Sequence, residues 1–342
     1  MICFTFQAKC DLIRLMIEGG NEKMAGIKDI AKKAGCSIST VSYALNGSPK
    51  VTEETRARIL QIAKELEYVP NGAARMLRTR ATKIIGCFLS DYSGPFYGRL
   101  LKGIRETLNS RGYELIVCSG EKSRRLLLEK MMDGAIILDV AFTDEDLLHY
   151  ADLGHKMVLL DRELEHDNIT TVLLDNKMGA KLAVSELLEK EIEKLYIVSG
   201  PIGSYDAQQR LFAAKTVAKE KDSVQVVELE GDFTKEAGIN AATQILRDYD
   251  GKPVGIFCLN DEMAIGFYDY LREATGRIGK DFHMIGFDNT DLASYVVPKL
   301  TTIDYSTSKW GKKATDSLLR LLEGRETMNE KINVKLTKGG SC

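Results

Sequence analysis

Residues 27–46 read IKDIAKKAGCSISTVSYALN, and this stretch decides the fold of the amino-terminal part of the chain. Apolar residues recur in its first half at the spacing of one helical face, and Gly35 then supplies the left-handed residue on which such a helix ends. Ser37 is a residue type that caps helices, so a second helix is predicted over residues 38–45. Beyond a turn cluster, Thr52 opens a third helix.

Three short helices with a tight glycine-containing turn between the first two form a helix-turn-helix. In this motif the second helix lies in the major groove of DNA, and its amino-terminal residues reach the base edges. Residues 39, 40 and 43 lie on the face of the second helix opposite its apolar side. Because many three-helix bundles bind no DNA, the pattern alone indicates a fold and leaves the ligand open.

The charge distribution separates this head from the rest of the chain. Residues 24–83 contain 11 Lys and Arg against 5 Asp and Glu, whereas residues 84–342 contain 33 against 41, within a net charge of −2. A basic head on an acidic body indicates a polyanion as the partner of the head. Charge alone also fits an ordinary solvated face.

Bulk composition is that of a globular protein of two or three domains: 342 residues, of which 44% are hydrophobic and 28% charged. No window approaches the run of about 18 apolar residues that a membrane helix needs. Charged residues interrupt the amino terminus, which argues against a signal peptide. The seven cysteines are scattered, without CxxC pairs or metal-ligand spacing. We therefore expect a cytoplasmic protein with reduced thiols and no metal site.

The first 23 residues share no pattern with the remainder of the chain. The run EGGNEK at 18–23 can be encoded by a purine-rich stretch resembling a ribosome-binding site just before the Met24 codon. We expect that the natural chain starts at Met24 and that residues 1–23 are a non-native extension. The alternative is an amphipathic arm, because some apolar residues there can share a helical face. Intact-mass measurement distinguishes the two.

After Lys83 the pattern alternates between buried-type strands and helices. One series runs from Ile84 to Leu160, and a second begins at Val172–Leu174 and closes at Met284–Phe287. Such alternation predicts an α/β body of parallel sheets covered by helices on both faces, and its length favours two lobes. We assign residues 84–173 with 303–322 to an N-terminal lobe, and residues 174–302 with 323–342 to a C-terminal lobe.

Polar side chains follow several of the predicted strands. They are Asp91, Asp161-Arg162, Asp175-Asn176, Asn260-Asp261 and Asp288-Asn289. Ligands of parallel sheets bind beyond the carboxyl ends of the strands, which here face a cleft between the lobes. Any one of these residues can also be a helix cap, but several converging on one cleft predict a small polar ligand such as a carbohydrate or nucleoside.

The wording of the head resembles that of the LacI/GalR family of repressors nearly end to end. The family signature TVSxxLN is present at residues 40–46, and YxPNxxAR at residues 68–75. The resemblance implies a DNA-binding head over residues 24–70, in which Ile38 and Ser39 face bases while Ser37, Thr40 and Asn46 hold phosphates. Many members have Arg where this chain has Tyr43, so a bidentate guanine contact is lost and the operator sequence cannot be copied from them.

The same resemblance assigns a hinge to residues 71–83, irregular off DNA and helical on it. Leu77 falls at the position that wedges between central base pairs, a mechanism that kinks DNA by apolar insertion. Asn71, Arg75 and Arg78 belong to the predicted DNA-binding set, with the arginines near backbone phosphates. The alternative role for Leu77 is that of a packing residue in a linker.

In the body, GPIGSYDAQQR (200–210), EGDF (230–233), LNDEMAIG (259–266) and IGFDNT (285–290) match the family's effector loops. The predicted effector-binding residues are Asp91, Phe96, Asp161, Arg162, Ser204, Asp206, Arg210, Phe233, Asn260 and Asp288. By the resemblance, Phe233 stacks on the ligand and Asp288 accepts its hydroxyl groups. Two departures affect this part: the chain is about eight residues short between Val117 and Asp133, and KEIEK (190–194) replaces the family's usual Gly-His.

We therefore expect a repressor of a carbohydrate-utilisation operon: a homodimer on a palindromic double-stranded operator, controlled by a sugar or sugar phosphate, with no cofactor and no membrane partner. No nucleophile triad, HExxH, P-loop or GxGxxG after a strand is present, which argues against an enzyme. A periplasmic-type sugar receptor would suit the body but not the head. Control by a protein corepressor, as in the catabolite-control branch, stays an alternative.

Overall fold

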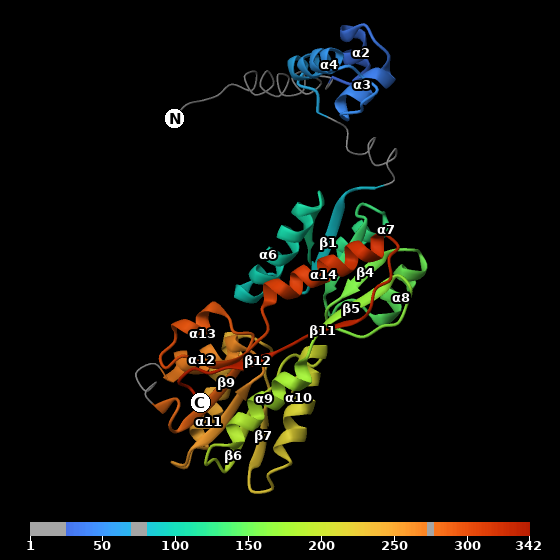
Figure 1. The fold of residues 1–342 in the computed structure, drawn as a ribbon. Coiled ribbons are helices and arrows are strands. Elements are labelled where there is room, and N and C mark those ends of the chain that lie inside the picture. Colours follow the sequence, from blue (N-terminus) through green and yellow to red (C-terminus); the bar gives the residue numbers. More distant parts are fainter. Residues whose placement is uncertain (1–24, 70–80, 272–276) are drawn as a thin grey trace, which may run out of the picture. The chain divides into compact units, whose positions relative to one another are not determined.

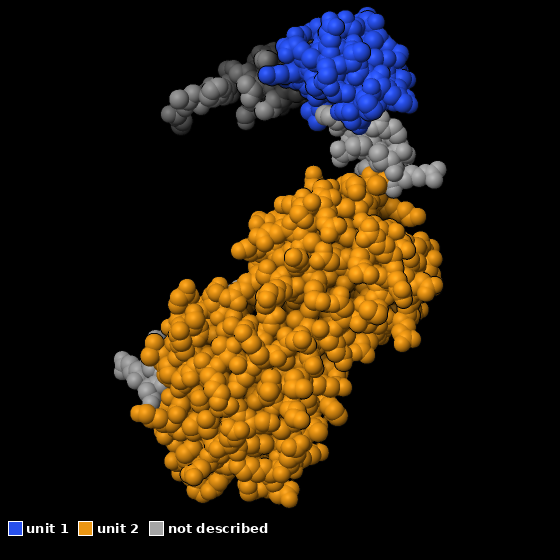
Figure 2. Space-filling view, viewed as in Figure 1, with its two compact units in different colours: residues 1–80 blue, residues 81–342 orange. Residues whose placement is uncertain are grey.

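The computed structural model describes residues 25–69, 81–271 and 277–342, and it divides the chain into two compact units at Arg80 (Figure 2). The first unit contains the predicted head and the second contains the whole α/β body. The predicted extension 1–23 and most of the predicted hinge lie outside the described residues. No helix of the described part is both long and apolar enough to cross a membrane.

The head consists of three helices, α2 (Ile27–Ala34), α3 (Ile38–Leu45) and α4 (Glu53–Glu65). Gly35 has φ 65°, the left-handed conformation that ends α2, and Ser37 Oγ accepts a hydrogen bond of 3.0 Å from the Thr40 amide to cap α3. Val41 of α3 packs with residues of α2 and α4 in one small core. The predicted helix-turn-helix is therefore confirmed, including the capped starts of α3 at Ser37 and α4 at Thr52.

Two six-stranded sheets form the body. The first has the order β11-β5-β4-β3-β1-β2, and the second has the order β12-β10-β9-β8-β6-β7. All pairings are parallel except that of β12 with β10. The strands of the first sheet are β1 (Ile84–Leu89), β2 (Glu114–Cys118), β3 (Gly134–Leu138), β4 (Lys156–Leu159), β5 (Ile169–Leu174) and β11 (Glu330–Ile332). Those of the second are β6 (Lys194–Val198), β7 (Gln225–Leu229), β8 (Val254–Cys258), β9 (Phe282–Phe287), β10 (Thr301–Asp304) and β12 (Lys335–Thr337).

Helices cover both faces of each sheet (Figure 1). The first lobe carries α6 (Gly94–Ser110), η2 (Glu121–Arg124), α7 (Arg125–Leu128), α8 (Asp144–Asp152) and α14 (Thr307–Leu322); the second carries α9 (Asn176–Leu188), α10 (Tyr205–Ala218), α11 (Lys235–Arg247), α12 (Asp261–Leu271) and α13 (Asp291–Tyr295). Successive residues of β3 alternate between two cores, since Ile136 packs with α6 whereas Ile137 packs with α7 and α8. This alternation is what two-sided burial requires of a strand.

Helices α6 and α14 pack unusually closely. A Cβ atom at Gly103 of α6 would lie 2.0 Å from the carbonyl oxygen of Ser308, so only glycine allows this approach. The contact fixes the carboxy-terminal α14 on the first lobe although its chain arrives from β10 of the second. The lobes are thus joined by several crossings of the chain.

Those crossings shift the lobe boundaries that we predicted. The strand β5 belongs to the first sheet rather than opening the second series, and β10 belongs to the second sheet up to Asp304. Within 323–342, assigned to the C-terminal lobe, β11 pairs with β5 of the first sheet. Because β11 has only three residues and one buried side chain, it contains no apolar run from which the sequence could predict a strand.

Candidate functional site

The exposed face of α3 carries the predicted base-reading residues. Ile38 and Tyr43 are 46% and 41% exposed, respectively, and Ser39 is exposed as well. Val41 and Ala44 point the other way, into the core of the head. Large apolar side chains at the surface of a small helix cost solvation and indicate a contact surface. The amino-terminal turn of α3 therefore presents an uncharged face on which apolar Ile38 lies beside the hydroxyl group of Ser39.

The residues predicted to hold phosphates also have structural roles. Ser37 and Thr40 share the amino-terminal cap, with their hydroxyl oxygens 2.9 Å apart. At the other end of α3, the Asn46 side-chain amide donates to the Ser42 carbonyl oxygen. The Lys50 ammonium lies 5.3 Å from the centroid of the Tyr43 ring, which places a cation beside the exposed tyrosine. The other predicted DNA-binding residues, Asn71, Arg75, Leu77 and Arg78, lie outside the described residues.

In the body, a cavity of about 330 Å³ lies between the two lobes. It is bounded by the carboxyl ends of β1 and β4 from the first lobe and of β6, β8 and β9 from the second. Nine of the ten predicted effector residues line it: Asp91, Phe96, Asp161, Ser204, Asp206, Arg210, Phe233, Asn260 and Asp288. The volume is at the lower end of the range of small-molecule sites, large enough for a monosaccharide.

Arg210 of α10 organises the second-lobe wall and is only 3% exposed. Its Nε donates to Asn176 Oδ1 at 2.8 Å and its Nη1 donates to the Leu259 carbonyl oxygen at 2.7 Å. The guanidinium also stacks on the Phe287 ring, with 3.6 Å between Cζ and the ring centroid. These bonds use two of its five N–H donors, and Nη2 forms no hydrogen bond with the described residues.

Two carboxylates lie beside this guanidinium. Asp206 Oδ2 is 3.9 Å from Nη2, and Asp288 Oδ1 is 3.7 Å from Nη1. Tyr305 donates a hydrogen bond of 2.7 Å to Asp288. Burial raises the pKa of Asp288 to about 6, although the charge of Arg210 acts in the opposite direction. Burial also raises the pKa of Asp206.

The backbone at two of these positions is held in the left-handed region. Asp288 has φ 107° and is followed by Asn289 at φ 45°, while Phe233 has φ 71°. Non-glycine residues adopt such angles at a cost of about 1–3 kcal/mol each, which the surrounding contacts must offset. Asn260 supplies one of those contacts, since its Nδ2 donates to the Phe233 carbonyl oxygen at 2.8 Å and its Oδ1 accepts from the Met263 amide. Asn260 therefore positions the aromatic side chain.

Arg162 is the predicted effector residue that does not line the cavity. Its guanidinium forms a two-pronged ion pair with Asp161 and donates to the carbonyl oxygens of Phe142 and Asp139. These contacts tie the end of β4 to the loop after β3. Arg162 stays outside the cavity lining because the neighbouring carboxylate and two carbonyl groups already use its donors.

Several residues that line the cavity were not among the predicted effector-binding residues: Ser90, Ser93, Tyr97, Asp232, Thr234, Glu262 and Thr290. Glu262, in the first turn of α12, is half-buried and has no hydrogen-bond or ion-pair partner in the described part of the chain. Burial and the nearby Asp91 charge both raise its pKa. A glutamate in a first helical turn reads in sequence as a favourable dipole partner, so only its place beside the cavity distinguishes it.

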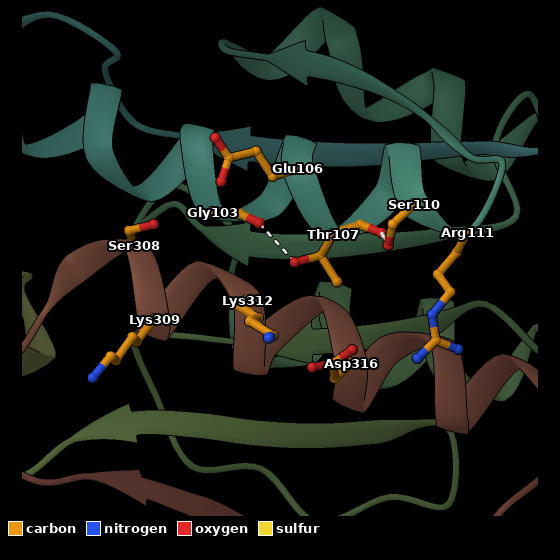
Figure 3. A pocket seen from close by; sticks show the side chains of 9 residues that line it. All are labelled: Gly103, Glu106, Thr107, Ser110, Arg111, Ser308, Lys309, Lys312 and Asp316. Atoms are coloured by element: carbon orange, nitrogen blue, oxygen red, sulfur yellow. Dashed lines mark hydrogen bonds between the residues drawn. The ribbon is translucent and has the colours of Figure 1, made fainter.

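A second hollow, of about 410 Å³, lies between α6 and α14 on the first lobe (Figure 3). Its hydroxyl groups are used within α6, because Thr107 donates to the Gly103 carbonyl oxygen and Ser110 to that of Thr107. Its charged side chains are of both signs and come from Glu106, Arg111, Lys309, Lys312 and Asp316. No predicted effector residue lines it.

Comparison with known protein families matches two parts of the chain. The model "Bacterial regulatory proteins, lacI family" covers residues 26–71, and "Periplasmic binding protein-like domain" covers residues 184–342. The first match coincides with the three-helix head. The second contains most of the second-lobe sheet and the loops that carry Arg210, Phe233 and Asp288.

Characterised relatives match nearly the whole chain. The transcriptional repressor PurR of Vibrio atlanticus (strain LGP32) is 31% identical over 315 residues, covering 89% of this chain and 93% of that protein. The ribose operon repressor of Escherichia coli (strain K12) is 31% identical over 309 residues, covering 86% and 92%.

Solved structures show the same relationship. A sugar-binding transcriptional regulator of the LacI family from Enterococcus faecalis is 42% identical with a TM-score of 0.71, covering 76% of this chain and 97% of that one. The lac repressor dimer bound to operator and an anti-inducer is 24% identical with a TM-score of 0.81, covering 93% and 99%. The latter likeness extends the shared fold to head and body together.

Proposed function

The chain belongs to the LacI family of bacterial regulatory proteins, and from that premise we propose that it represses a carbohydrate-utilisation operon under the control of a sugar-like effector. The interlobe cavity carries this proposal, since nine residues predicted from the sequence converge there from both lobes. Relatives that are transcriptional repressors support a regulator rather than an enzyme.

For DNA binding, we assign the base contacts to the exposed face of α3. Ile38 and Ser39 would meet base edges, and Tyr43 with Lys50 would form the flank of that face. Isoleucine suits contact with a thymine methyl group, and the tyrosine hydroxyl offers one hydrogen bond where arginine would offer two. The hinge, with Leu77 as a wedge, would supply the minor-groove contact.

For assembly, we propose a homodimer through the first lobe. The edge strand β2 exposes Ile116 and Val117, each 39% accessible, on a sheet edge that no other strand of the described residues covers. Apolar side chains on an open edge favour pairing with a second copy of the same surface. Leu101 of α6 and Leu115 of β2 line a shallow groove beside them, extending that surface.

Effector control would act through contacts between the lobes. Arg99 of α6 donates to the Asn289 carbonyl oxygen at 2.7 Å and pairs with Asp291, next to the Asp288 loop. Tyr205 of α10 donates to Glu163 of the first lobe at 3.1 Å. A ligand that binds one lobe arrangement better than another shifts the population of arrangements and with it the spacing of the paired heads.

The test is selection from a random double-stranded DNA library by the full-length protein, followed by anisotropy titrations of the selected sequence at several salt concentrations. The proposal predicts an enriched inverted repeat, with affinity at least a thousandfold above random DNA. A steep fall of affinity with salt is expected from the phosphate contacts. No enriched sequence, or an enriched sequence without two-fold symmetry, would contradict the proposal.

A further inference from the structure

The charges that line the interlobe cavity are strongly unbalanced. Among the described residues, one cationic side chain, that of Arg210, faces six carboxyl groups: Asp91, Asp161, Asp206, Asp232, Glu262 and Asp288. Only some of these carboxyl groups have a cationic side chain beside them. Arg210 serves both Asp206 and Asp288, and Asp161 is paired with Arg162 behind the wall.

Three of the acids have no cation beside them in the described part of the chain. Asp91 is held by the amides of Tyr92 and Ser93 and by the Ser93 hydroxyl, which lower its pKa and keep it ionised. Asp232 accepts only from Thr234. Glu262 has no hydrogen bond to any residue that the structure describes. These three side chains therefore make part of the cavity lining acidic, without a compensating cation among the described residues.

Glu262 belongs to one lobe and lies close to the other. It belongs to α12 of the second lobe, yet a Cβ atom on Gly94 of the first lobe would lie 2.6 Å from its Oε1. The closeness of Asp91 contributes to the raised pKa of Glu262. An anionic group placed between the lobes would meet both carboxylates, whereas a hydroxyl group could donate to either.

A phosphate-binding site needs the opposite arrangement. Phosphates are held by arginine forks, lysines or free backbone amides at helix starts. Here the amides of Tyr92 and Ser93, just before α6, donate to Asp91. Arg210, the one cationic side chain of the described lining, has two of its five N–H groups committed to Asn176 and Leu259 and lies beside Asp206 and Asp288. The described lining therefore offers many acceptors for hydroxyl groups, and its single cation is already shared by two carboxylates.

Building on the proposed function, we infer that the effector is an unphosphorylated, uncharged polyhydroxylated compound, and that the cavity rejects phosphate esters of the same compound. Of the two effector classes expected from the sequence, the free sugar fits and the sugar phosphate does not. Discrimination of at least about tenfold is expected from two or three unscreened like charges within several ångströms.

The experiment is isothermal titration calorimetry of the full-length protein with matched pairs: ribose and ribose 5-phosphate, glucose and glucose 6-phosphate, fructose and fructose 6-phosphate, and adenosine and its 5′-monophosphate. In each pair of which one member binds, the free compound should bind at least about tenfold more tightly. A phosphorylated member that binds more tightly overturns the inference but leaves a small-molecule effector in place. If no member of any pair binds, the effector proposal itself fails, and the inference falls with it.

Two variants test whether the acidic wall causes the selection. E262Q removes one uncompensated charge at nearly constant shape, so the free-to-phosphorylated affinity ratio should fall severalfold. E191Q removes the same charge from an exposed site between α9 and β6 and should leave the ratio unchanged. An unchanged ratio in E262Q, with operator affinity and thermal stability retained, would show that Glu262 does not select against anions.

Discussion

Arg210 Nη1 lies 3.7 Å from Asp288 Oδ1, and both side chains are buried at the wall of the interlobe cavity. The same guanidinium approaches Asp206, so a single cation neutralises two acids. Removing one partner of such a group leaves uncompensated buried charge, which costs more than the intact pair contributes. Replacing Arg210 or Asp288 should therefore change the stability of the body as well as effector binding.

Arg210→Met keeps much of the side-chain volume but removes the charge. We expect the free energy of unfolding of the body to fall by about 3 kcal/mol at pH 7, because Asp206 and Asp288 lose their cation. Urea denaturation followed by circular dichroism measures the change. Lys215→Met, on the half-exposed side of the same helix, is the control; its ion pair with Glu228 is exposed to solvent, so the change in stability should be less than about 1 kcal/mol. Equal effects of the two substitutions would contradict a role for Arg210 in balancing the acids.

The raised pKa of Asp288 predicts a pH dependence. Its folded-state pKa of about 6 exceeds the ordinary value of 3.8, so the folded protein binds the proton more tightly than the unfolded chain. The stabilisation from this proton is present below pH 3.8 and is lost as the pH rises to about 6. Asp288→Asn should therefore lessen the decline in unfolding free energy across this window. Asparagine also accepts the left-handed backbone of this position. Identical pH profiles for the two proteins would remove Asp288 as the titrating group.

The recognition face of α3 allows a test that leaves stability unchanged. Ile38→Ala should weaken binding to the selected operator by about 1–3 kcal/mol while leaving the melting temperature nearly unchanged, because Ile38 is already exposed. Leu60→Ala, an exposed apolar residue of α4, is the matched control and should leave operator affinity unaltered. Equal losses for the two variants, measured by anisotropy, would argue against the assigned face.

If β2 forms the dimer interface, a charged substitution on this strand should lower the molecular mass of the protein in solution from that of a dimer to that of a monomer. Val117→Glu places a charge on the open edge of β2, and we expect sedimentation equilibrium to show monomers at micromolar concentration, with operator affinity falling at least about a hundredfold. Leu153→Glu, exposed at the end of α8 in the same lobe, should remain dimeric. A dimeric Val117→Glu protein would place the interface elsewhere.

The parts that the sequence could predict are those where local chemistry decides the structure. The caps at Ser37 and Thr52 and the left-handed Gly35 give the helices of the head almost to the residue, because each acts within one turn. Strand-end acids such as Asp91 and Asp288 could be foreseen since parallel strands end on one side of a sheet. The family wording added Arg210 and Phe233, which spacing alone would not single out.

The parts that could not be predicted depend on partners distant in sequence. The strand β11 exists because β5, about 150 residues earlier, offers a free edge, and its own three residues carry no strand signal. Arg162 seemed a cavity residue because it follows Asp161, but the loop after β3 captures its guanidinium. Glu262 was missed because its significance lies in the proximity of Asp91 and Gly94 on the opposite lobe.

The central claim is that a neutral polyol in the interlobe cavity controls DNA binding by the head. The most direct measurement is operator anisotropy with and without the free compound that calorimetry identifies, for the natural sequence and for Asp288→Ala. We predict that the compound changes operator affinity of the natural sequence at least about fivefold, the lower end of typical allosteric coupling, and that Asp288→Ala binds operator normally but does not respond. A full response in Asp288→Ala, or no response in the natural sequence, would contradict the account.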